Sequence, residues 1–321
     1  MRPSGFAVGR GLVILAALSS LAFGPTDGRR RPRRVHMPYV TGQCLTPLPA
    51  HVAQQQRVRF SPAGRRGLQL DLVRPEGRGP HPLVLLVHGG AWRRGHRSYL
   101  RGTMHAFAAQ GYAAATVDYR LVDGRRTVFP GPVADLRCAV RTLRARSGEL
   151  GLDPNRFAAV GFSAGGHLVS MLGTAADRDE LDDGTCPISG HSPAVQSVVS
   201  FYGAYDLRAP LRVGPGADGA IRHFLGVSRQ RDPTRAALAS PISHVDRADP
   251  PMFLVHGVRD RIVEVDQPRR MYRALRRAGV AGSRELELPY HRHGFGLFPR
   301  RATDDPGLAC DTLDFLQSTL R

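Results

Sequence analysis

From about residue 57 onward, the chain alternates short apolar runs with stretches of helical periodicity, and no other feature constrains the fold as strongly. The run LVLLVH at 83–88 is apolar throughout, as expected for a strand buried on both faces of a parallel sheet. Repeated strand–helix units predict an α/β fold: a mostly parallel, doubly wound sheet with helices on both faces. We expect about eight strands, at 57–60, 68–74, 83–88, 112–117, 156–161, 197–201, 252–256 and 284–288, and helices at 99–110, 133–146, 163–172, 266–278 and 303–320.

Residues 51–321 are predicted to form a single domain, because α/β chains of this length often do so. Hydrophobic residues make up 42% of the sequence and there is no repeat period, which excludes disordered, collagen-like and repeat proteins. Two insertions near 174–194 and 206–249 are rich in glycine, proline and charge. Such insertions usually lie above the carboxyl ends of the strands, so we expect them to roof a binding site.

Residues 1–24 have the pattern of a secretory signal peptide. Arg2 and Arg10 precede the uncharged run Gly11–Phe23, which is shorter than the roughly 20 residues of a comfortable membrane span. We therefore expect a secreted or cell-envelope protein. Because Pro25 makes a poor cleavage context, an uncleaved anchor stays open, as does a misassigned start codon. A membrane partner is expected only if the segment is uncleaved.

Residues 25–50 are an arginine- and proline-rich segment, and we interpret them as a solvated linker rather than an electrostatic anchor. The formal net charge is +18, and all 45 basic residues are arginine. Such uniform usage suggests coding bias rather than a binding strategy. The positive charge is spread along the chain without interleaved aromatic residues, so no nucleic-acid partner is expected.

The four cysteines, Cys44, Cys138, Cys186 and Cys310, show no metal-ligand spacing, so no metal site is expected. In an exported protein they could form two disulfides with three possible connectivities. Cys138 could equally be a buried core residue, and the sequence leaves the pairing open.

The motif GFSAG at 161–165 lies between a buried apolar run and a helical stretch. A sharp strand-to-helix turn would project the Ser163 hydroxyl above the sheet, and the glycines leave no Cβ to collide around it. The N–H of Ala164, at the helix N-terminus, would then face a carbonyl group that Ser163 attacks. The motif therefore predicts a nucleophilic serine with one oxyanion donor beside it.

The second motif, HGGAW at 88–92, directly follows the run LVLLVH. Its glycines allow a loop to approach the nucleophile with its N–H groups turned inward, and we predict Gly90 and Ala91 as the other oxyanion donors. We expect His88 to tie down the loop. We interpret Trp92 as a wall of the substrate pocket rather than a core residue.

A nucleophilic serine needs a base, and the base needs an orienting acid; in this architecture the chain order is Ser, acid, His. Asp260 follows the apolar run 252–256, and His293 follows the run 284–288, so both fall at the same sheet edge as Ser163. We predict Asp260 as the acid, kept ionised by Arg259 and Arg261, and His293 as the base. Rivals are Glu264, Asp206 and Asp266 for the acid, the last of which more naturally caps a helix, and His291 for the base.

Together HGGAW, DPNRFAAVGFSAGGH, PPMFLVHGVRD and HRHGFG resemble the α/β-hydrolase superfamily. They look closest to the HGG-x-W esterase branch, which is related to hormone-sensitive-lipase-like carboxylesterases and acetyl-xylan/feruloyl esterases. The resemblance covers roughly 57–320. It implies hydrolysis of short acyl esters through an acyl-enzyme, with a small-molecule or polysaccharide-linked ester as substrate and no cofactor or metal.

Two other classes of function stay open. A kynurenine-formamidase-like amidase resembles the same HGG-x-W pattern, although export argues against it. A hydrolase-fold binding protein that has lost its catalytic residues is disfavoured, because all three triad positions are occupied. A prolyl-oligopeptidase-type peptidase would need a gating domain for which the main body has no room.

Overall fold

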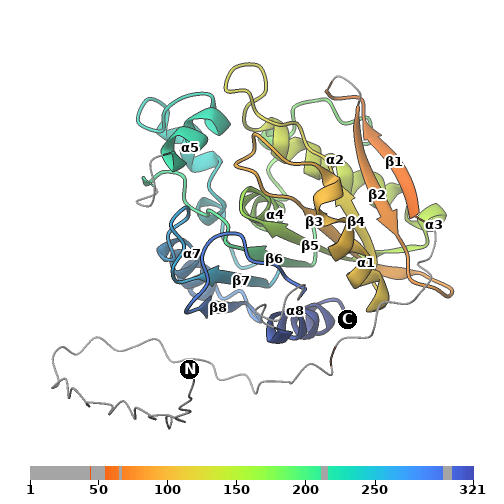
Figure 1. The fold of residues 1–321 in the computed structure, drawn as a ribbon. Coiled ribbons are helices and arrows are strands. Elements are labelled where there is room, and N and C mark those ends of the chain that lie inside the picture. Colours follow the sequence, from red (N-terminus) through yellow and green to blue (C-terminus); the bar gives the residue numbers. More distant parts are fainter. Residues whose placement is uncertain (1–43, 45–54, 65–66, 211–215, 299–305) are drawn as a thin grey trace, which may run out of the picture. The chain divides into compact units, whose positions relative to one another are not determined.

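A computed structural model describes residues 44, 55–64, 67–210, 216–298 and 306–321, and its strands form one eight-stranded sheet (Figure 1). The strand order is β1-β2-β4-β3-β5-β6-β7-β8. The six strands from β4 to β8 pair in parallel, and β1 and β2 extend one edge antiparallel. The expected mostly parallel sheet of about eight strands is thus confirmed. The strands are β1 Gln55–Ser61, β2 Leu68–Val73, β3 His81–Val87, β4 Ala113–Val117, β5 Leu152–Phe162, β6 Ser197–Phe201, β7 Met252–Gly257 and β8 Arg284–Leu288.

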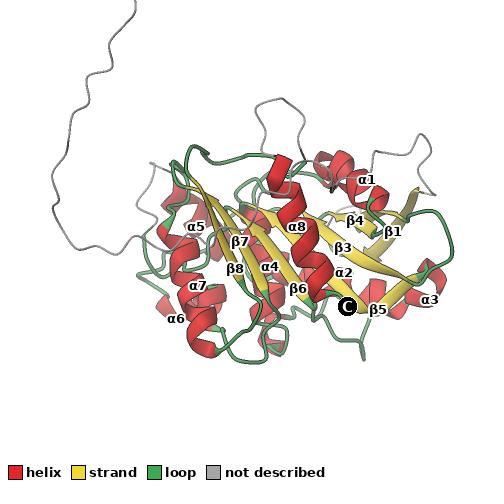
Figure 2. Ribbon diagram, turned by 90° about the horizontal axis from the view of Figure 1, so that it is seen from below, coloured by secondary structure: helices red, strands yellow, loops and turns green. Residues whose placement is uncertain are grey.

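Helices cover both faces of this sheet, as the alternation of apolar side chains along β3 requires. Leu83 and Leu85 belong to the core cluster that includes α2, α4 and α7, whereas Val84 and Leu86 belong to the cluster that includes α1 and α8. Figure 2 shows α8 crossing that second face. The helices are α1 Arg101–Ala109, α2 Gly131–Ala145, α3 Ser147–Leu150, α4 Ala164–Thr174, α5 Ala217–Leu225, α6 Pro233–Leu238, α7 Asp266–Ala278 and α8 Pro306–Thr319, with the short 3₁₀ helices η1 Arg97–Leu100, η2 Asp179–Leu181 and η3 Pro241–Ser243.

The insertion at 206–249 is more ordered than the sequence suggested, because it contains α5 and α6. Ile221, Phe224 and Leu225 of α5 are buried in the core. Asp232 begins α6 by accepting a hydrogen bond from the Arg235 N–H, the usual role of an N-cap aspartate. Periodicity alone missed these helices because each is shorter than ten residues and lies among glycine and proline.

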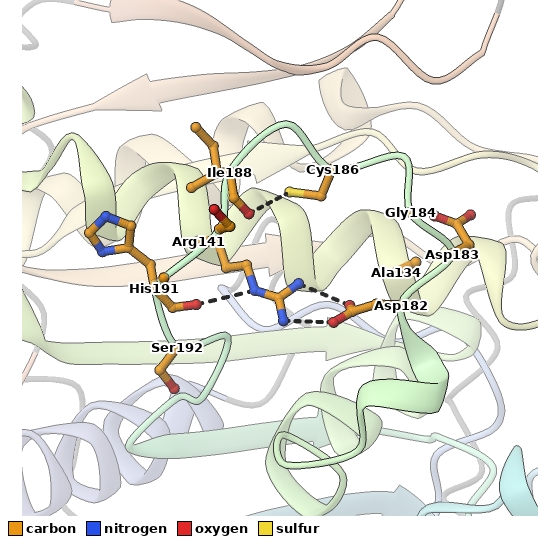
Figure 3. Close-up of a pocket in the computed structure, with 11 residues that line it drawn as sticks. Ala134, Arg141, Asp182, Asp183, Gly184, Cys186, Ile188, His191 and Ser192 are labelled. Atoms are coloured by element: carbon orange, nitrogen blue, oxygen red, sulfur yellow. Dashed lines mark hydrogen bonds and ion pairs between the residues drawn. The ribbon is translucent and has the colours of Figure 1, made fainter.

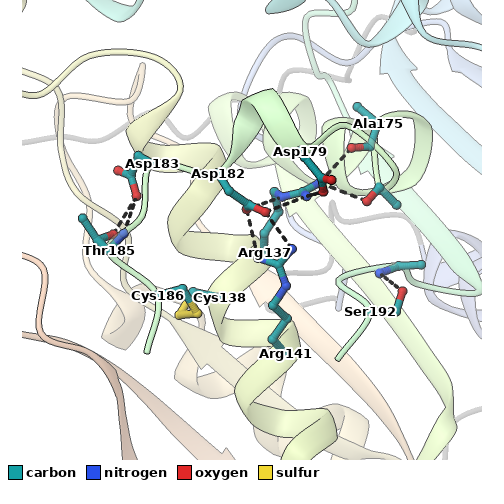
Figure 4. A network of polar contacts seen from close by, with 12 residues as sticks. Arg137, Cys138, Arg141, Ala175, Asp179, Asp182, Asp183, Thr185, Cys186 and Ser192 are labelled. Atoms are coloured by element: carbon teal, nitrogen blue, oxygen red, sulfur yellow. Dashed lines mark hydrogen bonds and ion pairs between the residues drawn. A yellow bond between two sulfur atoms is a disulfide. The ribbon is translucent and has the colours of Figure 1, made fainter. Parts of the chain in front are cut away.

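The insertion at 174–194 contacts the flank of α2, and the prediction that it roofs the Ser163 site is wrong. Arg137 and Arg141 of α2 both bind the carboxylate of Asp182, as Figure 4 shows. A disulfide between Cys138 and Cys186 fixes the same contact. A hollow of about 390 Å³ lies between α2 and this insertion, where Arg141 also donates to the His191 carbonyl (Figure 3).

The second disulfide joins Cys44 to Cys310 in α8, so the pairing that the sequence left open is 44–310 and 138–186. The predicted signal segment 1–24 and, apart from Cys44, the predicted linker 25–50 lie outside the described residues. Within the described ranges, no helix combines the length and apolarity needed to cross a bilayer.

Candidate active site

Ser163 occupies a strained turn between the end of β5 and the start of α4. Its backbone dihedrals are φ 56° and ψ −116°, a region that costs a non-glycine residue about 1–3 kcal/mol. A Cβ on Gly161 would collide with the Gly165 carbonyl, and one on Gly165 with the Val87 carbonyl. Only this glycine pattern allows β3, β5 and α4 to approach closely enough to hold the serine in that conformation.

The HGGAW loop lies directly against this turn. A Cβ on Gly89 would come within 2.7 Å of the Phe162 carbonyl oxygen and 3.1 Å of the Ser163 Cβ. Gly90, Ala91 and Trp92 all have positive φ, at 116°, 52° and 59°. Such a run of left-handed residues is costly for side chains with a Cβ, and strain of this kind concentrates at functional sites.

Among the described residues, the N–H groups of the predicted oxyanion donors Gly90, Ala91 and Ala164 have no backbone acceptor. In the described chain no backbone carbonyl accepts from Gly90 or Ala91. Ala164 is the first residue of α4, and the first four N–H groups of a helix have no intrahelical acceptor. The loop and the helix N-terminus thus present unpaired donors beside Ser163.

His293 lies in the loop after β8 and bridges the predicted nucleophile and acid. Its Nε2 is 2.8 Å from Ser163 Oγ, and its Nδ1 is 2.7 Å from Asp260 Oδ2. Since a carboxylate only accepts, Nδ1 carries the proton and Nε2 can accept from the serine hydroxyl. The structure therefore brings the three predicted side chains together in the order that proton transfer needs.

Asp260 follows β7 and is held on both of its oxygens. Oδ1 accepts from the N–H groups of Ile262, at 2.7 Å, and Val263, at 3.0 Å. Burial alone would raise the pKa of Asp260, but hydrogen bonds from His256 and His293 outweigh it and hold the pKa well below its usual range.

The reason predicted for that low pKa is wrong, although its direction is right. Arg259 and Arg261 flank Asp260 in sequence, yet both residues are exposed, and neither is among the main causes of the lowered pKa. The Arg259 guanidinium lies over the Tyr290 ring, 5.2 Å from its centroid. His256, His293 and a backbone N–H lower the pKa of Asp260, rather than the two flanking arginines.

The rival acids have other partners. Asp206 binds Arg208 and Arg270, and Glu264 also binds Arg270. Asp266 is the first residue of α7 rather than its cap, which is Val265, and its carboxylate pairs with Arg270.

The rival base, His291, also has other partners. Its carbonyl accepts from the Arg259 N–H, and its ring packs against Phe295 with 5.2 Å between centroids. Among the weighed candidates, only Asp260 and His293 connect to Ser163 by hydrogen bonds.

Trp92 is a core residue and does not wall an open pocket. Only 4% of it is exposed; its ring stacks on Phe224 of α5, and its Nε1–H donates to His167 Nδ1 at 3.2 Å. Burial lowers the pKa of His167 to about 4, so this imidazole is neutral and can accept. The tryptophan thus anchors the strained HGGAW loop to α4 and α5.

His88 has the expected structural role. It is buried, its Nδ1 lies 2.8 Å from the Gly89 carbonyl, and its ring stacks on Tyr119 with 4.4 Å between centroids. The Tyr119 hydroxyl in turn donates to the His88 carbonyl at 3.1 Å. Burial lowers the pKa of His88, which suits a neutral ring that fixes the loop.

Sequence reasoning missed two residues beside the site, Tyr202 and His256. The ring centroids of Tyr202 and His293 are 4.7 Å apart. The Tyr202 hydroxyl donates to the Phe295 carbonyl, which fixes the loop that carries His293. His256 contacts Asp260 from within β7. The spacing HG-x-x-D could have indicated His256, whereas nothing in the sequence around Tyr202 indicated its contact.

The side chains and N–H groups of the site determine what chemistry this arrangement can perform. Within the described ranges, no cluster of three or more His, Cys, Asp or Glu residues is arranged to hold a metal ion. A serine whose proton can pass to a histidine, beside unpaired N–H donors, is suited to attack an acyl carbon and stabilise the resulting oxyanion.

Comparisons with known proteins agree with this geometry. The BD-FAE family model matches residues 70–275. The esterase LipQ of Mycobacterium tuberculosis is 30% identical over 92% of this chain and 72% of LipQ. The esterase LipC of the same organism is 34% identical over 68% of this chain, which spans only 54% of LipC. The thermophilic esterase Est2 of Thermogutta terrifontis, with propionate bound, superposes with a TM-score of 0.67 at 25% identity, covering 83% of this chain and 95% of Est2.

Proposed function

The chain belongs to the BD-FAE family of the α/β-hydrolase superfamily, and from this premise we propose that it is a serine esterase. It cleaves carboxylic esters of short acyl groups through an acyl-enzyme intermediate. The observation that carries the proposal is the continuous hydrogen-bonded chain from Ser163 through His293 to Asp260.

In the proposed reaction, Ser163 Oγ attacks the ester carbonyl carbon while its proton passes to His293 Nε2. The imidazolium then protonates the leaving alcohol, and a water molecule later cleaves the acyl-enzyme by the same route in reverse. Asp260 accepts the Nδ1–H of His293 throughout, which fixes the productive tautomer and stabilises the positive ring. The low pKa of Asp260 supports this role, because the carboxylate stays ionised across neutral pH.

The N–H groups of Gly90, Ala91 and Ala164 are the proposed oxyanion donors. Each such donor is typically worth about 3 kcal/mol of transition-state stabilisation. The strained backbone of the loop supports this role, because the core contacts of Trp92 maintain a conformation that an isolated loop would leave. Donors held in place in this way need no reorganisation during the reaction.

We propose a short acyl group, and the alcohol part as an acetylated or feruloylated polysaccharide or a small molecule. Est2 was solved with propionate, a three-carbon acid, which supports the acyl size. The stacking of Trp92 on Phe224 gives further support. The two rings fill the space on the Trp92 side of the HGGAW loop, so a long acyl chain has no room there.

The proposal is tested by hydrolysis of p-nitrophenyl esters from acetate to octanoate, with and without a serine-directed phosphonate. We expect turnover that is highest for acetate to butyrate, and a stoichiometric adduct on the Ser163 peptide. Turnover of N-formylkynurenine but of no ester would support the amidase alternative. No turnover and no adduct would leave a binding protein.

Export through the segment 1–24 is also a proposal, motivated by the apolar run Gly11–Phe23 behind Arg2 and Arg10. N-terminal sequencing of the protein recovered outside the host's cytoplasm should find a start near residue 25. Intact Met1 on soluble cytoplasmic protein would contradict it.

A further inference from the structure

The carboxylate of Asp260 has a second histidine neighbour that the reaction above does not use. His256, the fifth residue of β7, is fully buried, and its Nε2 lies 3.2 Å from Asp260 Oδ2 and 2.9 Å from the Val263 carbonyl oxygen. Oδ2 is the same oxygen that accepts from His293. One oxygen of the acid therefore has two imidazole neighbours.

The protonation of His256 follows from its neighbours. Both groups near Nε2 are acceptors only, so Nε2 must carry a hydrogen, which it shares between the two. Its Nδ1 is buried with no hydrogen-bond partner in the described part of the chain. A second N–H there would be an unpaired buried donor on a charged ring, which is costly, so the ring is neutral.

From this contact we infer that His256 is a positioning residue for the triad, an inference that rests on the proposed esterase function. Two backbone N–H groups hold Oδ1 of Asp260, and His256 donates to Oδ2, the oxygen that also accepts from His293. The carboxylate plane is thereby fixed, and so is the direction in which His293 must lie to donate to it. Sharing Oδ2 between two donors also limits how strongly Asp260 attracts the His293 proton.

Other charged groups face the same side of the sheet as His256. Glu285 lies on the neighbouring strand β8, and its Oε1 is buried without a partner in the described structure. Burial raises the pKa of Glu285 to about 7, and Glu287 on the same strand raises it further. Arg269 and Arg273 on α7 lower it. A test of His256 by pH must therefore separate its effect from that of Glu285.

The test compares His256→Leu, which removes the donor at similar volume, with His256→Gln, whose amide can still donate to Asp260. Active sites are first counted by phosphonate titration, so that kcat refers to folded enzyme. In the leucine variant we expect kcat on acetate to fall roughly tenfold to a hundredfold, as for loss of one hydrogen bond to a charged group, with KM nearly unchanged. In the glutamine variant kcat should stay within about threefold of wild type.

The pH profile provides the readout that a merely structural role would not move. Without the His256 donor, Asp260 Oδ2 attracts the His293 proton more strongly, so the acidic limb of kcat/KM should move to higher pH by roughly half a unit or more. Glu285→Gln is the matched control, and it should leave that limb in place. Equal losses in the leucine and glutamine variants with an unmoved limb, or full activity in both, would overturn the inference.

A measurement without substrate separates this inference from the proposed function. The His293 Nδ1–H proton, hydrogen-bonded to Asp260, should give a far-downfield ¹H NMR signal that moves further downfield in His256→Leu but not in His256→Gln. An unmoved signal refutes the positioning role even if esterase activity is found. A moved signal in a chain that hydrolyses no ester would refute the proposed function alone.

Discussion

Replacing Asp260 by asparagine is the most discriminating test of the candidate site, because the structure determines which way the new amide must face. The N–H groups of Ile262 and Val263 both point at Oδ1, so the asparagine oxygen must occupy that position. The –NH₂ group then replaces Oδ2 and faces the Nδ1–H of His293. Two hydrogen-bond donors, the amide –NH₂ and the His293 Nδ1–H, would then face each other in a buried contact, which is destabilising because neither has an acceptor.

His293 can relieve this clash only by moving its proton to the other nitrogen. Nδ1 would then accept from the amide, and Nε2–H would point at Ser163 Oγ, 2.8 Å away. In that tautomer the imidazole cannot remove the serine proton. The expected loss is about 10⁴ in kcat, the size known for the wrong tautomer in a serine triad, or about 5.4 kcal/mol at 1.36 kcal/mol per tenfold.

The assay is p-nitrophenyl acetate hydrolysis at pH 7, with kcat and KM measured separately and unfolding followed by circular dichroism. KM should change less than about threefold, because the amide does not contact substrate. The matched control is Asp266→Asn. Asp266 is half exposed and pairs with Arg270 on α7, so its loss should cost about 0.5 kcal/mol of stability and leave kcat within twofold. A kcat in Asp260→Asn above a tenth of wild type, or a large loss in Asp266→Asn, would refute the tautomer argument.

Three further outcomes are expected. Ser163→Ala should lower kcat by about 10⁴–10⁶ with an unchanged unfolding midpoint, and residual turnover near wild type would exclude Ser163 as the nucleophile. Gly165→Ala should destabilise the protein by about 3 kcal/mol or more, because its Cβ meets the Val87 carbonyl; an unshifted denaturant midpoint would contradict this packing. Replacing Cys138 and Cys186 together by serine should cost about 4 kcal/mol in urea unfolding, from the 48-residue separation, and a loss below 1 kcal/mol would count against that cross-link.

Much of the fold could be predicted because its signals are local. Each predicted strand overlaps an observed one, since a strand buried on both faces must be apolar along its length, as 83–88 is. The short helix α5 could not be predicted, because it is stabilised by packing onto distant residues, as Phe224 stacks on Trp92, rather than by periodicity.

The candidate site likewise has a part that the sequence predicted and a part that it could not predict. Sequence order and the parallel sheet were enough to bring Ser163, Asp260 and His293 to one edge, because each follows the carboxyl end of a strand in a motif whose spacing has a mechanical reason. The sequence by itself thus determined the architecture and the identity of the side chains that we propose to react.

Only the tertiary structure decided what surrounds those side chains. It placed Trp92 in the core, put the insertion 174–194 against α2, paired the cysteines, and gave Asp260 a neighbour in His256 in place of flanking arginine charge. The physical reason is the separation along the chain of the residues that interact. Strand and turn preferences act between residues close in sequence, whereas burial, hydrogen-bond partners and pKa depend on groups that only folding brings within a few ångströms.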